Sequence, residues 1–129
     1  QRPEMAIHLF TRLIMEGKPI PVFGDGSTAR DYTYIGDIIE GIYRAMLYDK
    51  TKFEIFNLGN GKTVKLFELI AIIEQVTGKK AVIERKPMHL GDVEITIADI
   101  GKGNALLSYR PRTKIHKGVS FFSEWFESF

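Results

Sequence analysis

One stretch, Val22 to Ile39 with the sequence VFGDGSTARDYTYIGDII, constrains the fold more than any other part of the chain. It begins as a short apolar strand and turns at Gly24-Asp25-Gly26, a glycine-flanked dipeptide typical of tight turns. Asp37, followed three residues later by Glu40, has the pattern of a capping box and predicts that a helix begins at Asp37. Strand, turn and helix in this order predict a concave corner with one cation, Arg30, pointing into it.

Hydrophobic periodicity predicts an alternation of short strands and helices around this corner. A first helix should follow Pro3 and end near Gly17, because apolar residues recur between them at helical spacing. Further helices are expected over about 37–48, over about 66–77 and from residue 115 to the end, with a brief, weak one after Asp99. Strands are expected at 18–23, 53–58, 80–84 and 94–98. The fold class is therefore α/β, a small mixed domain of short strands and about three to four helices.

Composition narrows the class of protein. The chain has 129 residues, enough for one domain, and is 44% hydrophobic and 26% charged, as is ordinary for a globular protein. Its net charge of +2, with acidic and basic residues interspersed, gives no reason to expect a nucleic-acid partner. It has no cysteine, which excludes a disulfide or a thiol nucleophile. No apolar run approaches the roughly 18 residues of a membrane span, so we expect no membrane partner and a cytoplasmic location.

Arg30 is the sharpest candidate for ligand binding. A guanidinium offers five donors in a fixed fork that matches phosphate oxygens. Each such charge-assisted bond is worth roughly 1.5–3 kcal/mol. The spacing alone leaves an alternative open, in which Arg30 is a surface arginine paired with Asp25 or Asp31.

The motif GDGSTARDYTYIGDI resembles the substrate-binding part of NAD-dependent nucleotide-sugar epimerases and dehydratases, the extended short-chain dehydrogenase/reductase family. Within it, the closest resemblance is to the UDP-glucuronate 4-epimerases. Four further segments match in order: RPEMA, FNLGNGKTVKLFELI, PMHLGDVEITIADI and LLSYRPRT. The resemblance covers nearly the whole chain. It implies that residues 1–129 are the nucleotide-sugar binding domain, the C-terminal part of an extended Rossmann-type epimerase, and that the NAD-binding Rossmann domain is absent from this chain.

The same resemblance implies substrate-binding roles for seven residues. Arg30 would grip the nucleotide diphosphate, and Arg2 would reach the sugar carboxylate, unless it is only a solvated terminus. Asp92 would lie close to the ribose. His89 falls where many relatives carry a second phosphate-binding arginine, although a histidine is mostly neutral at pH 7. The remaining contacts would come from the backbone of Pro21, Val22 and Phe23, in the strand that meets the uracil ring. The alternative is that these three residues simply form an edge strand.

Two motifs imitate catalytic ones. The segment 56–63, FNLGNGKT, ends like a P-loop, but the glycine needed five residues before Gly61 is replaced by Phe56. Tyr48 and Lys52 have the Tyr-x-x-x-Lys spacing of the family's catalytic pair, but they straddle a helix end and a polar loop. The three histidines are isolated and suggest no metal site. We therefore expect no catalytic, cofactor-binding or metal-binding residue in this chain.

The function that the resemblance implies is that of the substrate-binding portion of an NAD-dependent UDP-sugar 4-epimerase, with UDP-glucuronate favoured. NAD on the other domain would take a hydride from the sugar 4-position and return it to the opposite face, while this chain holds the nucleotide. The expected partners are a UDP-sugar and the cofactor domain, whose docking site should be an exposed apolar patch, and the full-length enzyme should be a homodimer. Two alternatives stay open: the substrate domain of a nucleotide-sugar 4,6-dehydratase or reductase, and a non-catalytic nucleotide-binding module.

Overall fold

Two small sheets organise residues 2–129, the part of the chain that the computed structural model describes. Strand β1 (Pro19–Phe23) pairs in parallel with β4 (Val82–Lys86). In the second sheet β2 (Ala29–Arg30) is the central strand, antiparallel to β3 (Val64–Lys65) and parallel to β5 (Ile95–Thr96). The expected class of a mixed α/β domain with short strands is confirmed.

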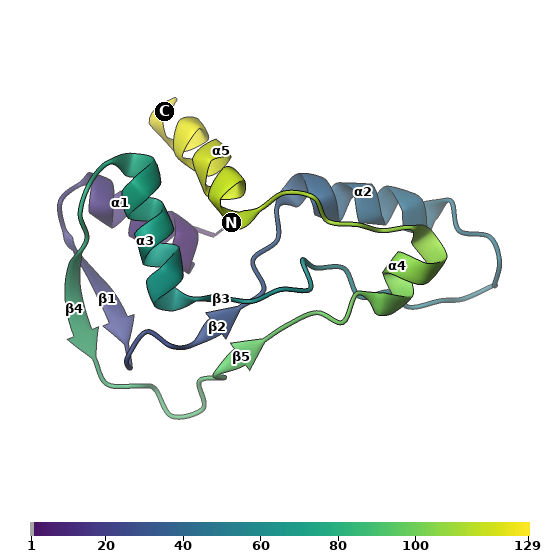
Figure 1. The fold of residues 1–129 in the computed structure, drawn as a ribbon, viewed down its shortest axis with the longest axis horizontal. Helices are drawn as coiled ribbons and strands as arrows, with labels where there is room; N and C mark the ends of the chain where they lie inside the picture. Colours follow the sequence, from purple (N-terminus) through teal and green to yellow (C-terminus); the bar gives the residue numbers. More distant parts are fainter. Residues whose placement is uncertain (1) are drawn as a thin grey trace.

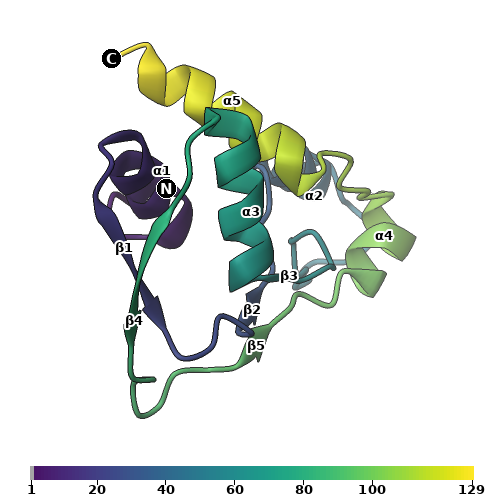
Figure 2. The same cartoon turned by 60° about the vertical axis from the view of Figure 1, so that its left-hand side comes forward.

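Five helices complete the described part of the chain (Figure 1). Helices α1 (Ala6–Met15) and α3 (Leu66–Thr77) pack against each other, and α5 (Ile115–Glu127) packs on α3. Figures 1 and 2 both show α1 and α3 beside the β1–β4 sheet. Helices α2 (Ile35–Met46) and α4 (Gly101–Leu107) contact each other at the other end of the molecule. No helix among residues 2–129 has the length and apolar character needed to span a membrane.

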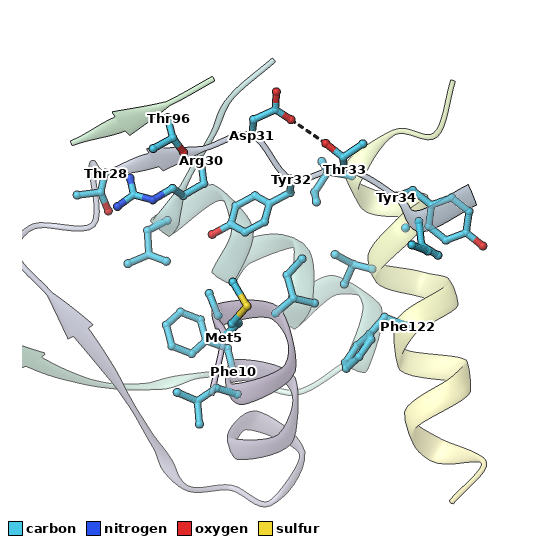
Figure 3. A pocket seen from close by; sticks show the side chains of 18 of the residues that line it. Met5, Phe10, Thr28, Arg30, Asp31, Tyr32, Thr33, Tyr34, Thr96 and Phe122 are labelled. Carbon is cyan, nitrogen blue, oxygen red and sulfur yellow. Dashed lines mark hydrogen bonds between the residues drawn. The ribbon is translucent and has the colours of Figure 1, made fainter. Parts of the chain in front are cut away.

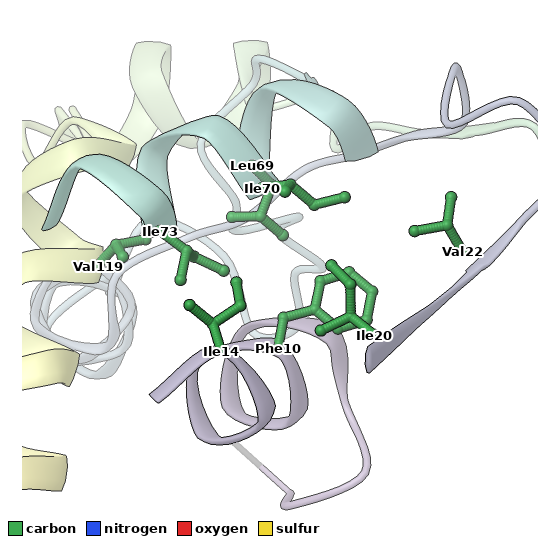
Figure 4. Close-up of a cluster of buried hydrophobic side chains, with 8 residues drawn as sticks. All are labelled: Phe10, Ile14, Ile20, Val22, Leu69, Ile70, Ile73 and Val119. Atoms are coloured by element: carbon green, nitrogen blue, oxygen red, sulfur yellow. The ribbon is translucent and has the colours of Figure 1, made fainter. Parts of the chain in front are cut away.

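The main core lies where α1, α3 and α5 meet the inner face of β1 (Figure 4). Its buried side chains recur at helical spacing on the helices and at every second residue of β1, as each backbone period requires. Burial of each large aliphatic side chain contributes about 1.5–3 kcal/mol. The cluster consists of Phe10, Ile14, Ile20, Val22, Leu69, Ile70, Ile73 and Val119.

Helix α2 begins at Ile35, so the expectation that Asp37 caps it is wrong. Asp37 lies in the first turn and is only 7% exposed. Its carboxylate accepts hydrogen bonds from the main-chain N–H groups of Arg112, at 3.2 Å, and Thr113, at 3.0 Å. The Asp37 carboxylate, which a capping box would bond to the N–H groups of its own helix, therefore bonds to the main chain of a distant segment instead. The segment thereby tied to α2 leads directly into α5.

The strand expected at 53–58 is also absent from the structure. The segment has alternating exposed and partly buried side chains, as a strand would, but none of the described residues forms a ladder with it. Its partly buried side chains contact other elements instead: Glu54 pairs with Lys102 of α4, and the Phe56 ring lies 5.3 Å from that of Tyr48. A strand needs a paired neighbour, so its pattern alone could not make one.

The other boundaries shift by small amounts. Helix α3 spans the expected residues, and Gly78 ends it with a φ of 69°, which a side chain would resist. Strand β4 covers 82–86 rather than 80–84, because its register is set by pairing with β1. Strand β5 retains only two of the expected residues 94–98.

Candidate functional site

A cavity of about 1070 Å³ opens beside β2, between α1, β1 and the start of α5. One side of the cavity is apolar (Figure 3). It consists of Met5, which directly precedes α1, Phe10 of α1 and Phe122 of α5. The opposite side carries the polar side chains of the segment that follows the Gly24–Gly26 turn. Apolar walls with a few placed polar groups are typical of small-molecule sites.

Strand β1 has one edge that pairs with no other strand of residues 2–129, and this edge lies beside the cavity. The N–H of Gly24 donates to the C=O of Lys86 at 2.9 Å, so the peptide groups of Gly24 face β4. Because neighbouring residues of a strand direct their peptide groups to opposite edges, those of Phe23 face away from β4. Phe23 and Pro21 both line the cavity, and proline has no N–H to offer. Among the described residues, the unpaired backbone donor and acceptor at this edge are therefore those of Phe23.

Arg30 extends from β2 into the same cavity (Figure 3). Its Nη1 donates to the C=O of Ala29, at 2.9 Å, and to the C=O of Glu94, at 3.2 Å. Within residues 2–129 Arg30 forms no ion pair. Two carbonyls thus orient a guanidinium whose charge no carboxylate neutralises, an arrangement suited to an anionic ligand.

The two aspartates considered as partners of Arg30 bond elsewhere. The Asp25 carboxylate accepts from the N–H of Ser27, at 2.9 Å, and from its hydroxyl, at 2.5 Å, and the hydroxyl bond lowers the pKa of Asp25. Asp31 accepts from Thr33 and from the main chain of three residues in neighbouring loops. The surface ion pair that the spacing left open is therefore not formed.

Tyr32 is a cavity residue that the sequence motifs did not single out. It lies two residues from Arg30, on the same face of an extended segment, and this spacing was the available signal. Burial raises the pKa of Tyr32, and the positive charge of Arg30 opposes that shift. The phenol therefore remains a protonated hydrogen-bond donor at neutral pH.

The structure brings together five of the seven residues expected to bind substrate. Pro21, Phe23, Arg30 and Asp92 line the cavity. His89 lies at its edge, with its ring 4.4 Å from the ring of Phe23 and inclined to it by 33°. The N–H of Asp92 donates to the C=O of His89 at 3.2 Å, which closes the turn that carries both.

Val22 and Arg2 lie apart from this group. Val22 is in the main core, 2% exposed, and its peptide groups face β4 because they alternate with those of Phe23. Arg2 is exposed and forms an ion pair with Glu4 at 3.3 Å. Glu4 itself lines the cavity, so Arg2 is near the site without entering it. Residues 2–129 contain no cluster of side chains suited to hold a metal ion.

Comparison with known proteins identifies the family. The family model for GDP-mannose 4,6 dehydratase matches residues 1–121. A UDP-glucuronate 4-epimerase from Thermodesulfobacterium geofontis is 42% identical over 125 residues, which cover 96% of this chain and 38% of that protein. UDP-glucuronate 4-epimerase 5 of Arabidopsis thaliana is 38% identical over 146 aligned positions, which cover 99% of this chain and 33% of that protein.

A solved structure agrees with these sequences. It is that of a UDP-glucuronic acid 4-epimerase mutant from Bacillus cereus in complex with UDP-4-deoxy-4-fluoro-glucuronic acid and NAD. It is 32% identical, with a TM-score of 0.92 over 99% of this chain and 41% of that one. The chain thus spans well under half the length of the relatives that it matches. Since the family model extends over almost all of its sequence, the chain belongs to the GDP-mannose 4,6 dehydratase family, among the nucleotide-sugar epimerases and dehydratases of the extended short-chain dehydrogenase/reductase class.

Proposed function

We propose that this chain binds the nucleotide of a UDP-sugar and serves as the substrate-binding portion of an NAD-dependent 4-epimerase, with UDP-glucuronate as the favoured substrate. The observation that carries the proposal is Arg30, a cation in a cavity with no carboxylate partner among the described residues. Two carbonyls hold one side of its guanidinium, which leaves the remaining donors of the fork for the diphosphate. The names of the relatives support the choice of sugar.

The uracil would lie against the free edge of β1. There the backbone N–H and C=O of Phe23 form a donor–acceptor pair, which suits the edge of a pyrimidine. The paired rings of Phe23 and His89 would limit how far the base reaches. Asp92, on the same turn as His89, would be the acceptor for a ribose hydroxyl, and Tyr32, which also lines the cavity, would donate a hydrogen bond to the ligand.

The described residues do not fit a dinucleotide such as NAD. A dinucleotide site needs a glycine-rich turn between a strand and the N-terminus of a helix. Here the Gly24–Gly26 turn leads from β1 into β2, and the Gly59–Gly61 turn leads into β3. The Bacillus cereus structure contains NAD, and we propose that the NAD of this enzyme is bound by a separate domain while this chain contributes only the binding of the substrate.

That grip would serve the reaction without touching the reacting atoms. Binding energy from the unreactive nucleotide holds the sugar at the reacting centre and lets it turn while it stays tethered. The chain would then be an essential part of an isomerase although none of its own residues is catalytic. The expected homodimer and the cytoplasmic location stay predictions.

The partner domain has a candidate docking surface on α2. Ile35, Ile39, Ile42 and Met46 follow one another at helical spacing and are each at least 48% exposed. We propose that this stripe, together with the exposed Phe53 and Ile55 of the segment after α2, packs against the cofactor domain. Exposed apolar surface of this extent commonly marks an interface.

A dehydratase is the second candidate, because the family model that matches is described as GDP-mannose 4,6 dehydratase. Both reactions need the same grip on a nucleotide. The residues that separate an epimerase from a dehydratase are expected on the cofactor domain, so the discriminating experiment is an assay of the longer protein with UDP-glucuronate and with a nucleotide-hexose.

The grip itself is tested by titrating the protein with uridine, UMP and UDP in a calorimeter. If Arg30 holds phosphates beside a uracil site, affinity should rise with each added phosphate, and it should fall steeply with salt for UDP but not for uridine. A chain that binds all three equally, or that binds none, contradicts the proposal. Inorganic pyrophosphate is the control that separates phosphate binding from recognition of the nucleoside.

A further inference from the structure

Asp31 follows Arg30 directly and makes an unusual set of hydrogen bonds. Its Oδ1 accepts from the hydroxyl of Thr33, at 2.9 Å, and from the N–H of Asn60, at 2.8 Å. Its Oδ2 accepts from the N–H of Gly61, at 2.9 Å, and from the N–H of Ala98, at 3.1 Å. One carboxylate therefore connects three separate segments of the chain, and within residues 2–129 it forms no ion pair.

These bonds reinforce the strand that carries Arg30. Strand β2 is only two residues long, so backbone pairing alone gives it few ladder bonds. Asn60 and Gly61 precede β3 on one side of β2, and Ala98 follows β5 on the other. The Asp31 carboxylate thus fixes both neighbours of β2 beyond the point where the ladders end.

The bond to Ala98 also bears on the orientation of Arg30. Along β5, the C=O of Glu94 accepts from the N–H of Ala29 at 2.8 Å, and the C=O of Thr96 accepts from the N–H of Asp31 at 3.0 Å. Two residues beyond Thr96, the N–H of Ala98 donates to the Asp31 carboxylate, so that contacts between the two segments continue at the same two-residue interval past the end of the ladder. The same Glu94 carbonyl accepts from Nη1 of Arg30. A shift of β5 would therefore move one of the two carbonyls that orient the guanidinium.

We propose that Asp31 is a positioning residue for Arg30. Asp31 holds β5 in register, so that the guanidinium of Arg30 is fixed before the ligand arrives. The inference rests on the proposed function, because its consequence is tighter binding of a nucleoside diphosphate. Figure 3 shows the carboxylate turned away from Met5 and Phe10, the apolar wall of the cavity. Three N–H groups and one hydroxyl already donate hydrogen bonds to the Asp31 carboxylate. Asp31 can therefore support Arg30 without competing with a diphosphate for the guanidinium.

The test is a double-mutant cycle on UDP affinity with Asp31→Asn and Arg30→Ala. The amide of asparagine replaces one acceptor oxygen with donors, which would face the main-chain N–H groups and loosen β5. Asp31→Asn should weaken UDP binding by about 3- to 10-fold when Arg30 is present. It should cause no further loss in the Arg30→Ala background, because Asp31 acts through the arginine.

Asp37→Asn is the matched control. Asp37 belongs to the same sequence motif and also accepts hydrogen bonds from two main-chain N–H groups. Those groups belong to residues 112 and 113, before α5, and not to the segments that flank β2. It should lower the melting temperature and leave UDP affinity unchanged. Equal losses of affinity from Asp31→Asn in both backgrounds, or no loss in either, would overturn the positioning role while leaving the proposed function intact.

A second measurement needs no ligand. In an NMR spectrum of the unliganded protein, the Nε–Hε signal of Arg30 should report a rigid side chain, and Asp31→Asn should make it mobile. A purely structural role would lower the melting temperature and leave that signal unchanged. If Asp31→Asn does not fold, Thr33→Val removes a single donor to the same carboxylate and should change the signal in the same direction. Failure of the wild-type protein to bind UDP contradicts the proposed function, whereas a rigid Arg30 in both variants contradicts this inference.

Discussion

Glu74 of α3 shows how one carboxylate fixes a turn. It accepts from the N–H of Ala81 at 2.8 Å and pairs with Lys80 at 3.2 Å. The bond from Ala81 is the main reason that the pKa of Glu74 is lowered, and the contribution of Lys80 is smaller. Lys80 is 89% exposed, and such surface ion pairs contribute little. The stabilising interaction is therefore the main-chain bond that ties the end of α3 to the approach to β4.

We predict that Glu74→Gln lowers the melting temperature at pH 7 and that this difference shrinks in acid. A carboxyl whose folded pKa is depressed contributes its full stability above the unfolded pKa and loses it as the pH falls through the folded pKa. Melting curves from pH 7 to pH 3 check this. Lys80→Met is the control and should have little effect. A difference that is constant with pH would contradict the interpretation.

Single residues differ in how far the sequence reveals them. Arg30 was singled out through the family resemblance, because its spacing alone left open a surface ion pair with Asp25 or Asp31; its position in the cavity agrees with that interpretation. The hydrogen bonds of Asp31 were not predictable, since its partners include the main-chain N–H groups of residues 60, 61 and 98, which any sequence provides. The burial of Val22 follows from its alternation with Ile20, but the family motif directed attention to its backbone.

At the scale of elements, α2 packs closely against its neighbours at a glycine, Gly41, which has no side chain to keep them apart. A Cβ added at Gly41 would lie 2.9 Å from side-chain atoms of Leu58 and of Tyr109. Tyr109 is 1% exposed and its hydroxyl donates to the C=O of Gly59 at 2.7 Å, so its ring has little freedom to move. At Gly118, in α5, the nearest atom to such a Cβ lies at an ordinary contact distance of 3.8 Å.

These two glycines should respond in opposite ways to alanine. In an open helical position, alanine is favoured over glycine by about 0.5–1 kcal/mol. Gly118→Ala should therefore stabilise the protein by about that amount. At Gly41 the clash with a fixed ring, about 1–3 kcal/mol, should exceed the gain, so that Gly41→Ala destabilises. Urea denaturation of both variants checks the signs, and a stabilised Gly41→Ala would mean that Tyr109 has room to move.

The elements show the same limit of sequence analysis as the residues. Helix α3 was predicted to the residue because its apolar period and its terminal glycine agree. The strand at 53–58 was not found, although its alternation is as regular as that of β1, because pairing is not a local property. Likewise, the start of α2 was misjudged because the carboxylate of Asp37 bonds to residues 112 and 113.

Across the whole molecule, the distribution of apolar surface is uneven. The main core binds α1, α3, α5 and β1 together, whereas α2 has a stripe of exposed apolar side chains. The chain spans 38% of the length of the epimerase from Thermodesulfobacterium geofontis. Both facts agree with the proposal that this chain works as part of a larger assembly.

We expect the 129-residue chain to self-associate through the stripe on α2, because apolar surface that lacks its partner drives association. Replacement of Ile39 and Met46 by lysine should shift sedimentation toward the monomer. Gln75→Lys, which adds a charge to an exposed position on α3, should not. A wild-type chain that sediments as a clean monomer at high concentration would contradict the prediction.

We also predict that the chain does not bind NAD measurably. The glycine turns of the described residues lead into strands and provide no helix N-terminus for a pyrophosphate. Calorimetry should give no NAD signal, and saturating NAD should leave the affinity for UDP unchanged. Micromolar NAD binding would refute the assignment of the cofactor to another domain.

The most direct test of the central claim measures UDP affinity and melting temperature on the same Arg30→Ala protein. If Arg30 holds the diphosphate, affinity should fall by about 1.5–3 kcal/mol, or roughly 10- to 150-fold, while the melting temperature shifts little. Arg30→Lys should recover only part of the loss, since a point charge does not reproduce the fork. An unchanged affinity for UDP together with a lowered melting temperature would show that Arg30 is structural and that the binding site lies elsewhere.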